Sequence, residues 1–553
     1  MLRRLDGRAG HYALLSAVWA LLCLPNLGGP SLWDVDEGNN AEAAQEMYFS
    51  GNVIVPTFNG QVREDKPALL YWLQGAAYAA FGVNEFAARL PSALAALLAV
   101  LATYELGRRQ FGKGAGLLAG LALASAALFC ASAHFANPDA LLNAFTALSM
   151  LFFWLAYTRG GAWLAAVGVS SGLAVLAKGP VGTVLPGAVA LAFLLWRREP
   201  RKLWDVGWLW GSLTFLLVAA PWYVWVGVET KGQWLVGFLG RHNIQRFRGP
   251  LEGHGGPLWY YFPVLIAGLA PWSAFLGPAC WHAWKRLRGR SGDESTPPAG
   301  GPRPALQFLL CWAGVYFVFF SVARTKLPNY VLPLYPAAAI LTGYFLDQWR
   351  RGRIALPAWA MRTCLVCLAL MGVGLTAGLL VGGGLIEVAA VRGRCLPGLG
   401  RWAAVGGALV AGALAGGWCL RLGRRGGVIA AVAVSAVLFT APLAAWGVAA
   451  VDRYKAPRAL AGLLPADQQF RDVRVGAFNY FQPSLVFYCR REVQRLEYEW
   501  QAYEFLRCPL PSYLFVRAEA WEAIHARAPR PFREVGRHYD IYDGKEVVVI
   551  TNE

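Results

Sequence analysis

The stretch ALLNAFTALSMLFFWLAY, residues 140–157, decides the fold, because it is strongly apolar and carries no charged side chain. A helix that crosses the hydrocarbon core of a bilayer needs about 20 such residues. The same pattern recurs along the chain and predicts about thirteen membrane spans. The predicted spans lie near residues 11–30, 88–107, 115–133, 140–157, 162–177, 181–196, 207–227, 257–282, 305–322, 331–348, 361–385, 402–420 and 428–448.

The composition agrees with a polytopic membrane protein. Of the 553 residues, 56% are hydrophobic, and the mean hydropathy is +0.39. The formal net charge of +18 comes from 51 Lys and Arg against 33 Asp and Glu. These cations fall mostly in short clusters between apolar runs, where the positive-inside rule places them. The charge therefore indicates membrane topology and not nucleic-acid binding.

The basic clusters also predict the orientation of the chain. The start, MLRRLDGRAGHYALLSAVWALLCLPNLGG, has the basic flank and apolar part of a signal peptide but no A-x-A-like cleavage site, so we expect an uncleaved first span. With the N-terminus in the cytoplasm, all the predicted cytoplasmic connections are basic: RRQFGK, RREPRK, KRLRGRSGDESTPPAGGPR, RRGR and RLGRR. An odd number of crossings then places the C-terminus outside.

Beyond Ala450 the chain becomes richer in charged residues. The runs VRVGAF, LVFYC, SYLFV and EVVVI favour strands, and AEAWEAIHARA favours a helix. We expect a transmembrane domain over residues 1–450 and a small soluble extracytoplasmic α/β domain over 451–553. Most of the ten cysteines lie in or beside apolar runs and are expected to be core residues, whereas the sequence leaves open whether Cys489 and Cys508 form a disulfide.

The acidic residues that follow the first span have two readings. In WDVDEGNNAEAAQEM, Asp36 and Glu37 could supply an acid, a base or a metal ligand outside the membrane. Asp36 could equally cap a short helix. Asp139 in HFANPDALLNAF has the same ambiguity, because Asn137 and Pro138 before it are typical of a helix start.

The stretch VREDKPALLYW gathers four charges at the predicted outer surface. Arg63 and Lys66 could hold a phosphate or pyrophosphate, while Glu64 or Asp65 could bind a metal. The alternative is a self-neutralising cluster ahead of a helix that begins with Pro.

A later outer segment, GRHNIQRFRGPLEGHGG, contains His242 and His254, two of only seven histidines in the chain. Together with Asp65 they would suit zinc, although their separation matches no standard zinc spacing.

Three cationic or aromatic residues precede a later span. In SVARTKLPNYVLPLYPA, Arg324, Lys326 and Tyr330 would suit a lipid-linked phosphate, or would simply anchor the helix at the interface. Lys178 in AVLAKGPVGTVLP has the same two readings. Taken together, the outer segments place carboxylates, histidines and cations on one side of the membrane, as transfer from a lipid-carried phosphate donor requires.

Six stretches resemble, in order, the bacterial ArnT-like branch of the dolichyl-phosphomannose protein mannosyltransferase superfamily: DVDEGNNAEAAQEM, GNVIVPTFNGQVREDKPALLYWL, HFANPDALL, GRHNIQRF, ARTKLPNYVLPLYPA and FNYFQPSLVFY. The order of these motifs is specific for the superfamily but not for a sugar. The resemblance implies the GT-C fold of polyprenyl-phosphate-dependent glycosyltransferases, with extracytoplasmic juxtamembrane helices. The best-known relative modifies lipid A with aminoarabinose.

The resemblance also implies roles for individual residues. Asp36, in the acidic pair with Glu37, looks like the essential acidic residue of the family, and Asp139 looks like its second acidic residue. Lys66 is similar to the lysine that grips the donor phosphate. Asp65 stands where the lipid A enzymes carry a metal-contacting Glu, and His242 looks like a metal ligand. Further donor-phosphate candidates are Arg63, Arg324, Lys326 and Tyr330, and His254 is a further metal candidate.

The function expected from these assignments is sugar transfer from a polyprenyl-phosphate donor to a lipid A-like lipid, a protein or a glycan. The expected location is the bacterial inner membrane. A carboxylate base with a phosphate leaving group fits displacement with inversion. A divalent metal, Zn or Mg, is a possible cofactor. A carrier or flippase for a lipid-linked sugar is the alternative, and it would place polar residues through interrupted spans.

Overall fold

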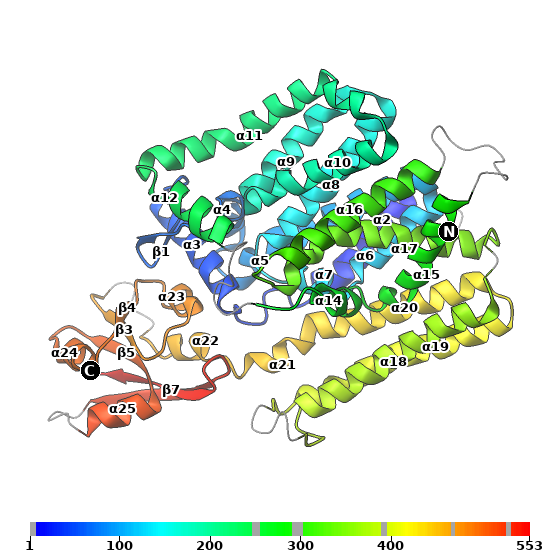
Figure 1. Cartoon of the computed structure of the whole chain (residues 1–553). Helices are drawn as coiled ribbons and strands as arrows, with labels where there is room; N and C mark the ends of the chain where they lie inside the picture. Colours follow the sequence, from blue (N-terminus) through cyan, green and yellow to red (C-terminus); the bar gives the residue numbers. More distant parts are fainter. Residues whose placement is uncertain are drawn as a thin grey trace.

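The computed structural model describes residues 7–245, 255–289, 302–354, 356–388, 395–465, 471–526 and 532–553. Figure 1 shows a large helical body of long helices that run side by side, with a smaller α/β unit beside one end of it. The N-terminus lies at the opposite end of the body from this unit.

Each predicted span corresponds to a helix or to a bent pair of helices. The helices are α2 (Arg8–Cys23), α5 (Glu85–Phe111), α6 (Lys113–Ala124) with α7 (Ala127–Ala133), α8 (Asp139–Arg159), α9 (Leu164–Lys178), α10 (Val181–Arg197), α11 (Gly207–Glu229), α14 (Tyr261–Gly268) with α15 (Leu276–Arg288), α16 (Pro302–Val322), α17 (Tyr335–Arg350), α18 (Ala358–Gly382), α19 (Ala404–Arg421) and α20 (Arg425–Pro442).

In the described part of the chain, 8 helices are long and apolar enough to cross a membrane, or up to 10 spans if each bent pair counts as one. The remaining predicted spans correspond to α2, α10 and α17, which have 16, 17 and 16 residues. The chain is therefore a multi-pass membrane protein, as predicted. The total of about thirteen crossings stays a prediction, because these three helices are shorter than a typical span.

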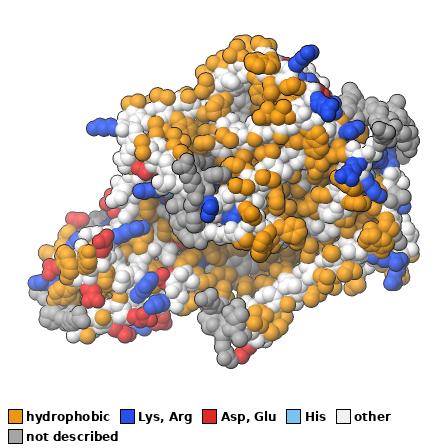
Figure 2. Space-filling view, viewed as in Figure 1, with side chains coloured by type: hydrophobic (Ala, Val, Ile, Leu, Met, Phe, Trp, Pro, Cys, Tyr) orange, Lys and Arg blue, Asp and Glu red, His pale blue; other side chains and the backbone are white. Residues whose placement is uncertain are grey.

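The surface has the polarity expected of a body that lies in a bilayer. Figure 2 shows hydrophobic side chains over most of the helical body, Lys and Arg gathered towards the end near the N-terminus, and charges of both signs on the C-terminal unit. Large apolar side chains such as Leu217 and Val228 on α11 are 65% and 70% exposed. Lipid would cover such side chains in a membrane.

Short elements at one end of the body carry most of the outer segments that the sequence singled out. They are α3 (Asp36–Ser50), the hairpin of β1 (Thr57–Phe58) and β2 (Gln61–Val62), α4 (Leu69–Phe81), α12 (Gln233–Val236), η3 (Gly237–Gln245) and η5 (Pro328–Leu334). The hairpin turns on Asn59 and Gly60, whose φ angles of 53° and 74° are both positive. Asn-Gly favours this two-residue turn, because both residues tolerate the left-handed conformation.

The C-terminal unit contains a five-stranded sheet with the order β4-β3-β5-β7-β6. Strands β3, β4 and β5 are parallel, and β7 pairs antiparallel with β5 and β6. Its elements are α21 (Ala449–Asp452), α22 (Ala456–Ala461), β3 (Arg474–Phe478), α23 (Pro483–Cys489), β4 (Gln494–Leu496), α24 (Glu499–Arg507), β5 (Ser512–Arg517), α25 (Ala518–His525), β6 (Arg533–Asp540) and β7 (Lys545–Thr551).

The inner strands of this sheet, β3, β5 and β7, are mostly buried on both faces. Tyr513 and Phe515 of β5 pack in one apolar cluster with α22 and α23, and Leu514 and Val516 pack in another with α24 and α25. Successive residues of a strand point to opposite faces, so a strand covered on both sides is apolar throughout. This is why SYLFV and EVVVI were recognisable in the sequence. The domain boundary near residue 450 stays a prediction.

The prediction of a strand for LVFYC was wrong, because these residues form helix α23. Pro483 stands at the first helical position, where a missing N–H costs nothing, and it starts the helix. Helix α23 packs against α3 and buries Leu485, Phe487 and Cys489. Tertiary packing thus overrides the strand preference of β-branched and aromatic residues. The helix predicted for AEAWEAIHARA is confirmed as α25, and Cys489 and Cys508 are free thiols in this structure.

The C-terminal unit is docked onto the loop that follows α2. The Asp34 carboxylate accepts hydrogen bonds from the backbone N–H and the hydroxyl of Ser484. Lys455 donates to the carbonyl of Ser31, and the backbone N–H of Leu32 donates to the Tyr488 hydroxyl at 2.8 Å. The loop and the unit are therefore held together by several buried or partly buried polar contacts.

This docking is expected to weaken as pH rises from about 4 to about 7. Burial raises the pKa of Asp34 to about 7, against about 3.9 for an exposed aspartate. Between these values the docked carboxyl keeps a proton that the undocked one loses, so a rising pH favours undocking. After correction for the intrinsic exchange rate at each pH, the amides of α23 should be less protected from hydrogen–deuterium exchange at pH 8 than at pH 5.5, and Asp34→Asn should reduce this difference. Equal protection at both pH values in the wild type would contradict the assignment.

Candidate functional site

A cavity of about 760 Å³ opens where several outer segments meet the ends of the membrane helices. We call it the inner cavity. Its polar lining consists of Asp65, Lys66, Lys178, His242, Thr325 and Tyr330. Its apolar lining consists of Leu142, Pro180, Val181, Val184, Leu185, Phe238, Leu239, Ile244, Phe319, Phe320 and Ala323.

The apolar lining of the inner cavity reaches the side of the helical body. Val184 on α10 is 56% exposed, and Leu239 is 42% exposed. In a membrane these side chains would face lipid. The cavity thus joins a rim of cations to an apolar wall that is accessible from the bilayer, a combination that fits an amphiphile with a charged head and a hydrocarbon tail.

The segment that begins at Arg63 forms one edge of the inner cavity. Arg63 itself is buried behind this edge and donates to the Tyr71 hydroxyl at 3.0 Å and to the Asn40 side chain at 3.4 Å. Asp65 forms an ion pair with Arg63 at 3.2 Å, and its other oxygen is hydrogen-bonded to His242 Nε2 at 2.8 Å. Burial opposes ionisation of Asp65, but the His242 hydrogen bond and the Arg63 charge outweigh it, and its pKa falls well below the usual range.

These contacts fix Asp65 as an anion and leave Lys66, the next residue, at the cavity wall. Two segments far apart in the sequence, around residues 65 and 242, therefore meet here as expected.

A second charged group lies at the wall made by α8 and α9. Lys178, at the end of α9, forms an ion pair with the buried carboxylate of Asp139, at the start of α8. The Asn329 side chain donates to the other oxygen of Asp139 at 2.7 Å. The ammonium of Lys178 lies 4.8 Å from the centroid of the Tyr330 ring. Asp139 thus holds Lys178 in place at the cavity, and the segment 323–330 joins the same site.

The adjacent acids Asp36 and Glu37 have different environments. Glu37 is fully buried, and both of its oxygens accept hydrogen bonds from Arg89 at 2.8 Å. It also accepts the backbone N–H of Ala136 at 2.6 Å and that of Trp33 at 2.8 Å. Arg89 donates its remaining hydrogens to three backbone carbonyls. Glu37 therefore joins α3, α5 and the loop before Asp139, and its oxygens are already in use.

Asp36 is exposed at the first position of α3. Its side chain caps no helix, and among the described residues it forms no hydrogen bond or ion pair. Asp36 lies one helical turn before Asn40 of α3, whose side chain contacts Arg63 at 3.4 Å behind the charged edge of the inner cavity. Of the two acids, Asp36 is the one with oxygens open to a substrate.

Loss of the Glu37–Arg89 pair is expected to destabilise the fold. Arg89→Met would leave Glu37 buried without its cation, which costs about 3–5 kcal/mol. At roughly 2–4 °C per kcal/mol for chains of moderate size, the thermal midpoint of the purified protein should fall by several degrees or more. Asp36→Asn is the matched control and should leave the midpoint unchanged. An unchanged midpoint in Arg89→Met would show that the pair does not hold the outer segments together.

Three of the predicted donor-phosphate residues, Arg63, Arg324 and Lys326, do not line the inner cavity in this structure. Arg324 is exposed. Lys326 is buried, and its ammonium donates to the carbonyls of Ser321 and Ala323 at 2.6 and 2.9 Å. Ser321 lies in the last turn of α16 and Ala323 directly follows the helix, where a cation satisfies carbonyls that have no helical partner. The predicted roles of all three residues stay predictions.

The predicted metal site is not complete among the described residues. Asp65 and His242 bond to each other, His254 lies outside the described residues, and no group of three or more His, Cys, Asp or Glu side chains that could hold a metal is found in the described part. These residues do not by themselves fit a resident divalent metal. The metal stays a prediction, and no step proposed below depends on one.

Lys178 is the residue at this site that sequence reasoning undervalued. Its signal was a single lysine at the tip of a hairpin between two apolar runs, which is equally typical of an interfacial anchor. The structure brings it to Asp139 and Tyr330. Chemically, the site offers two lysines to an anionic head group, an apolar wall to a tail, and an open carboxylate nearby.

Comparison with known proteins relates the site to membrane glycosyltransferases. The family model described as dolichyl-phosphate-mannose-protein mannosyltransferase matches residues 65–225. An undecaprenyl phosphate-alpha-4-amino-4-deoxy-L-arabinose arabinosyl transferase of Pseudomonas aeruginosa is 32% identical over 62% of this chain and 60% of its own length. A protein of the same description from Proteus mirabilis is 33% identical over 61% and 60%. The matches thus span about three-fifths of the length of these relatives.

Solved structures show the same fold over almost the whole chain. ArnT from Cupriavidus metallidurans in the apo state has a TM-score of 0.77 at 25% identity, covering 98% of this chain and 97% of its own. The same enzyme bound to undecaprenyl phosphate has a TM-score of 0.82 at 24% identity, with 99% of both chains covered. The oligosaccharyltransferase AglB from Archaeoglobus fulgidus has a TM-score of 0.52 at 13% identity, over 94% of this chain and 71% of its own.

Proposed function

This chain is an ArnT-like member of the GT-C superfamily, and from that premise we propose that it transfers a sugar from a polyprenyl-phosphate donor to an extracytoplasmic acceptor. The donor is a sugar on undecaprenyl phosphate or a similar lipid. The acceptor is a lipid A-like lipid, a protein or a glycan. The enzyme lies in the bacterial inner membrane, with its N-terminus in the cytoplasm and its C-terminal domain outside.

The observation that carries this proposal is the composition of the inner cavity. Lys66 and Lys178 stand at its polar rim, and α10 and α16 supply an apolar wall that reaches the lipid side of the body. A sugar phosphate without a lipid would not need this wall, and a plain lipid would not need the two cations. A polyprenyl-phosphate sugar needs both.

The lysines act on the leaving group. As the bond between the sugar and the phosphate breaks, negative charge grows on the phosphate, and fixed cations stabilise that charge more in the transition state than in the bound donor. Asp139 keeps Lys178 oriented through their ion pair, and the Tyr330 ring packs against the same ammonium. Asp139 is therefore a positioning residue in this scheme.

Asp36 acts on the acceptor. Its free carboxylate deprotonates or orients the attacking hydroxyl, which approaches the sugar from the face opposite the phosphate. Because the phosphate leaves without protonation, one carboxylate is enough, and the configuration at the sugar carbon is inverted. If the acceptor is itself a phosphate, Asp36 has no proton to remove and serves only to orient it.

Comparison of cells with and without this chain tests the proposed activity. Mass spectrometry of envelope lipids and glycoproteins should reveal a class of molecule that carries one additional sugar only when the chain is present. The mass difference identifies the sugar, and the modified molecule identifies the acceptor. Identical lipid, protein and glycan profiles, under conditions in which the chain is produced, would contradict the proposal.

A further inference from the structure

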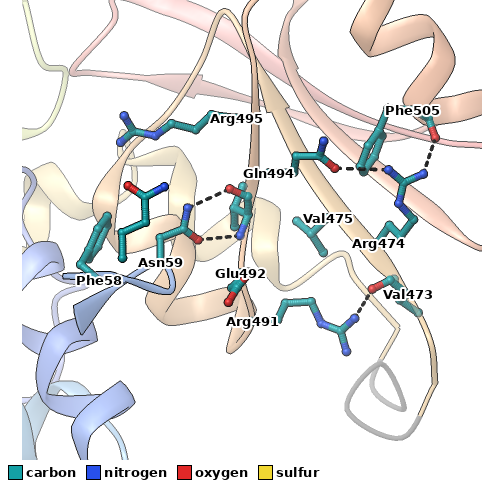
Figure 3. Close-up of a pocket in the computed structure, with 12 residues that line it drawn as sticks. Phe58, Asn59, Val473, Arg474, Val475, Arg491, Glu492, Gln494, Arg495 and Phe505 are labelled. Carbon is teal, nitrogen blue, oxygen red and sulfur yellow. Dashed lines mark hydrogen bonds between the residues drawn. The ribbon is translucent and has the colours of Figure 1, made fainter. Parts of the chain in front are cut away.

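A second pocket, of about 730 Å³, lies between the β1–β2 hairpin and the C-terminal unit. We call it the outer pocket. Its lining residues are Phe58, Asn59, Gln61, Val473, Arg474, Val475, Arg491, Glu492, Val493, Gln494, Arg495 and Phe505. In Figure 3 the hairpin residues Phe58 and Asn59 lie on one side, and Arg474, Val473 and Phe505 lie on the other.

The hairpin side of the outer pocket is fixed by its turn. The Asn59 side chain donates to the carbonyl of Val493 at 3.0 Å and accepts the N–H of the same residue at 2.8 Å (Figure 3). This double contact imitates the pairing of two strands. The positive φ of Gly60 permits the turn that presents Asn59, and an added Cβ at Gly60 would approach Glu492 to 2.5 Å. The turn therefore sets the width of the pocket.

Two arginines of the outer pocket lie against aromatic rings and not against acids. The guanidinium of Arg474 lies 4.4 Å from the centroid of the Phe505 ring, and that of Arg495 lies 3.5 Å from the Phe481 ring. Arg474 also donates to the Gln494 side chain at 3.2 Å and to the backbone carbonyl of Phe505 at 3.5 Å (Figure 3), both neutral partners. Stacking on an aromatic ring fixes the plane of a guanidinium without neutralising its charge.

Other arginines of the same unit are neutralised. Arg471, Arg507, Arg517 and Arg537 each form an ion pair with a carboxylate. Among the described residues, no carboxylate lies within ion-pair distance of Arg474 or Arg495. The described residues that line the pocket include three arginines, Arg474, Arg491 and Arg495, and one acid, Glu492. The outer pocket thus carries a local excess of fixed positive charge. A basic surface that serves only to be solvated would not require its arginines to be fixed in this way.

The outer pocket and the inner cavity share one short segment. Gln61 lines the outer pocket, and Asp65 lines the inner cavity. Four residues of fully extended chain span at most about 14 Å. One acceptor molecule can therefore reach both places at once.

We propose that the outer pocket binds an anionic group, a phosphate or a carboxylate, on a sugar of the acceptor, while the reacting group of the same acceptor enters the inner cavity. This inference rests on the proposed function and adds the chemical class of the acceptor. Arg474 and Arg495 hold the anion by charge-assisted hydrogen bonds. The amide side chains of Gln61 and Gln494 present hydrogen-bonding groups to the sugar ring, while Asn59 is held by Val493.

Direct binding to the full-length protein tests this inference. Calorimetry in phosphatidylcholine nanodiscs compares a hexose phosphate, the corresponding uronate and the neutral hexose. We expect the two anions to bind and the neutral hexose not to bind. The double variant Arg474→Gln, Arg495→Gln should weaken anion binding at least tenfold. Arg507→Gln with Arg537→Gln is the matched control, since both arginines are ion-paired outside the pocket, and it should bind like the wild type.

Further measurements distinguish a failure of this inference from a failure of the proposed function. Lys66→Ala should keep the hexose phosphate affinity, and the Arg474 and Arg495 double variant should keep undecaprenyl phosphate binding. Absent anion binding in the wild type, unchanged binding in the double variant, or loss of binding only in Lys66→Ala would overturn the inference. Loss of hexose phosphate binding in phosphatidylglycerol nanodiscs would assign the pocket to a bilayer lipid and would also overturn it. Failure of undecaprenyl phosphate to bind the wild type would instead count against the proposed function.

Discussion

Asp36→Asn is expected to lower the rate of sugar transfer by about a thousandfold for a hydroxyl acceptor. Asp36 is exposed at the start of α3, and among the described residues it has no hydrogen-bond or ion-pair partner. The substitution keeps the size of the side chain but removes its charge and its ability to accept a proton. Initial rates with purified protein in liposomes, at saturating donor, measure the effect.

The controls for this variant separate chemistry from folding. Glu229→Gln removes an exposed carboxylate at the end of α11 and should leave the rate unchanged. The thermal midpoint of Asp36→Asn should match that of the wild type, because no described contact is lost. A rate within about threefold of the wild type with a hydroxyl acceptor would remove Asp36 from the mechanism.

Lys66→Ala is expected to lower the transfer rate by about 10²–10³-fold, the effect of removing one donor that stabilises developing negative charge. Lys66 lines the inner cavity next to Asp65, whose carboxylate is held by Arg63 and His242. The loss should appear in kcat more than in KM, because the charge on the phosphate grows as the bond breaks. Lys66→Arg should restore part of the rate.

An exposed lysine on the same side provides the comparison for this prediction. Lys231 is exposed and lies just beyond the end of α11. The Lys231→Ala enzyme should transfer sugar like the wild type. A Lys66→Ala enzyme with wild-type kcat would show that the phosphate is held elsewhere, and the proposed cavity would then not be the donor site.

The membrane body was predictable because hydropathy is a local property. Each predicted span corresponds to a helix or a bent pair, since a run such as residues 140–157 is apolar whatever surrounds it. The convergence of the outer segments followed from topology together with the family resemblance. The contact between Asp65 and His242 is an example, because both segments were placed on the same side of the membrane.

The individual roles within the site were not predictable in the same way. Asp36 and Glu37 are adjacent and of the same charge, and what distinguishes them is Arg89, which lies 52 residues from Glu37 and takes both of its oxygens. The Lys326 ammonium donates to backbone carbonyls near the end of α16, and this contact depends on the path of the loop that follows the helix. These are consequences of packing, and no local pattern in the sequence encodes them.

The outer pocket could not have been found from the sequence. It exists because Asn59 in the hairpin pairs with Val493, which lies 434 residues later in the chain. The Asn-Gly turn was recognisable as a turn, but its partner was not. Likewise, nothing in the sequence distinguishes Arg474 and Arg495 from ordinary surface arginines. Only the structure shows that they pack on Phe505 and Phe481.

If the inner cavity breaks the bond between a sugar and its polyprenyl phosphate, the two parts of the donor must separate. A donor labelled in both its sugar and its lipid tests this directly, in liposomes that contain the purified chain and an extract of envelope lipids. We expect the sugar label to appear covalently on an acceptor while an equal amount of free polyprenyl phosphate is released. Movement of the intact donor across the bilayer, with both labels still joined and no product formed, would contradict this expectation and would favour a carrier.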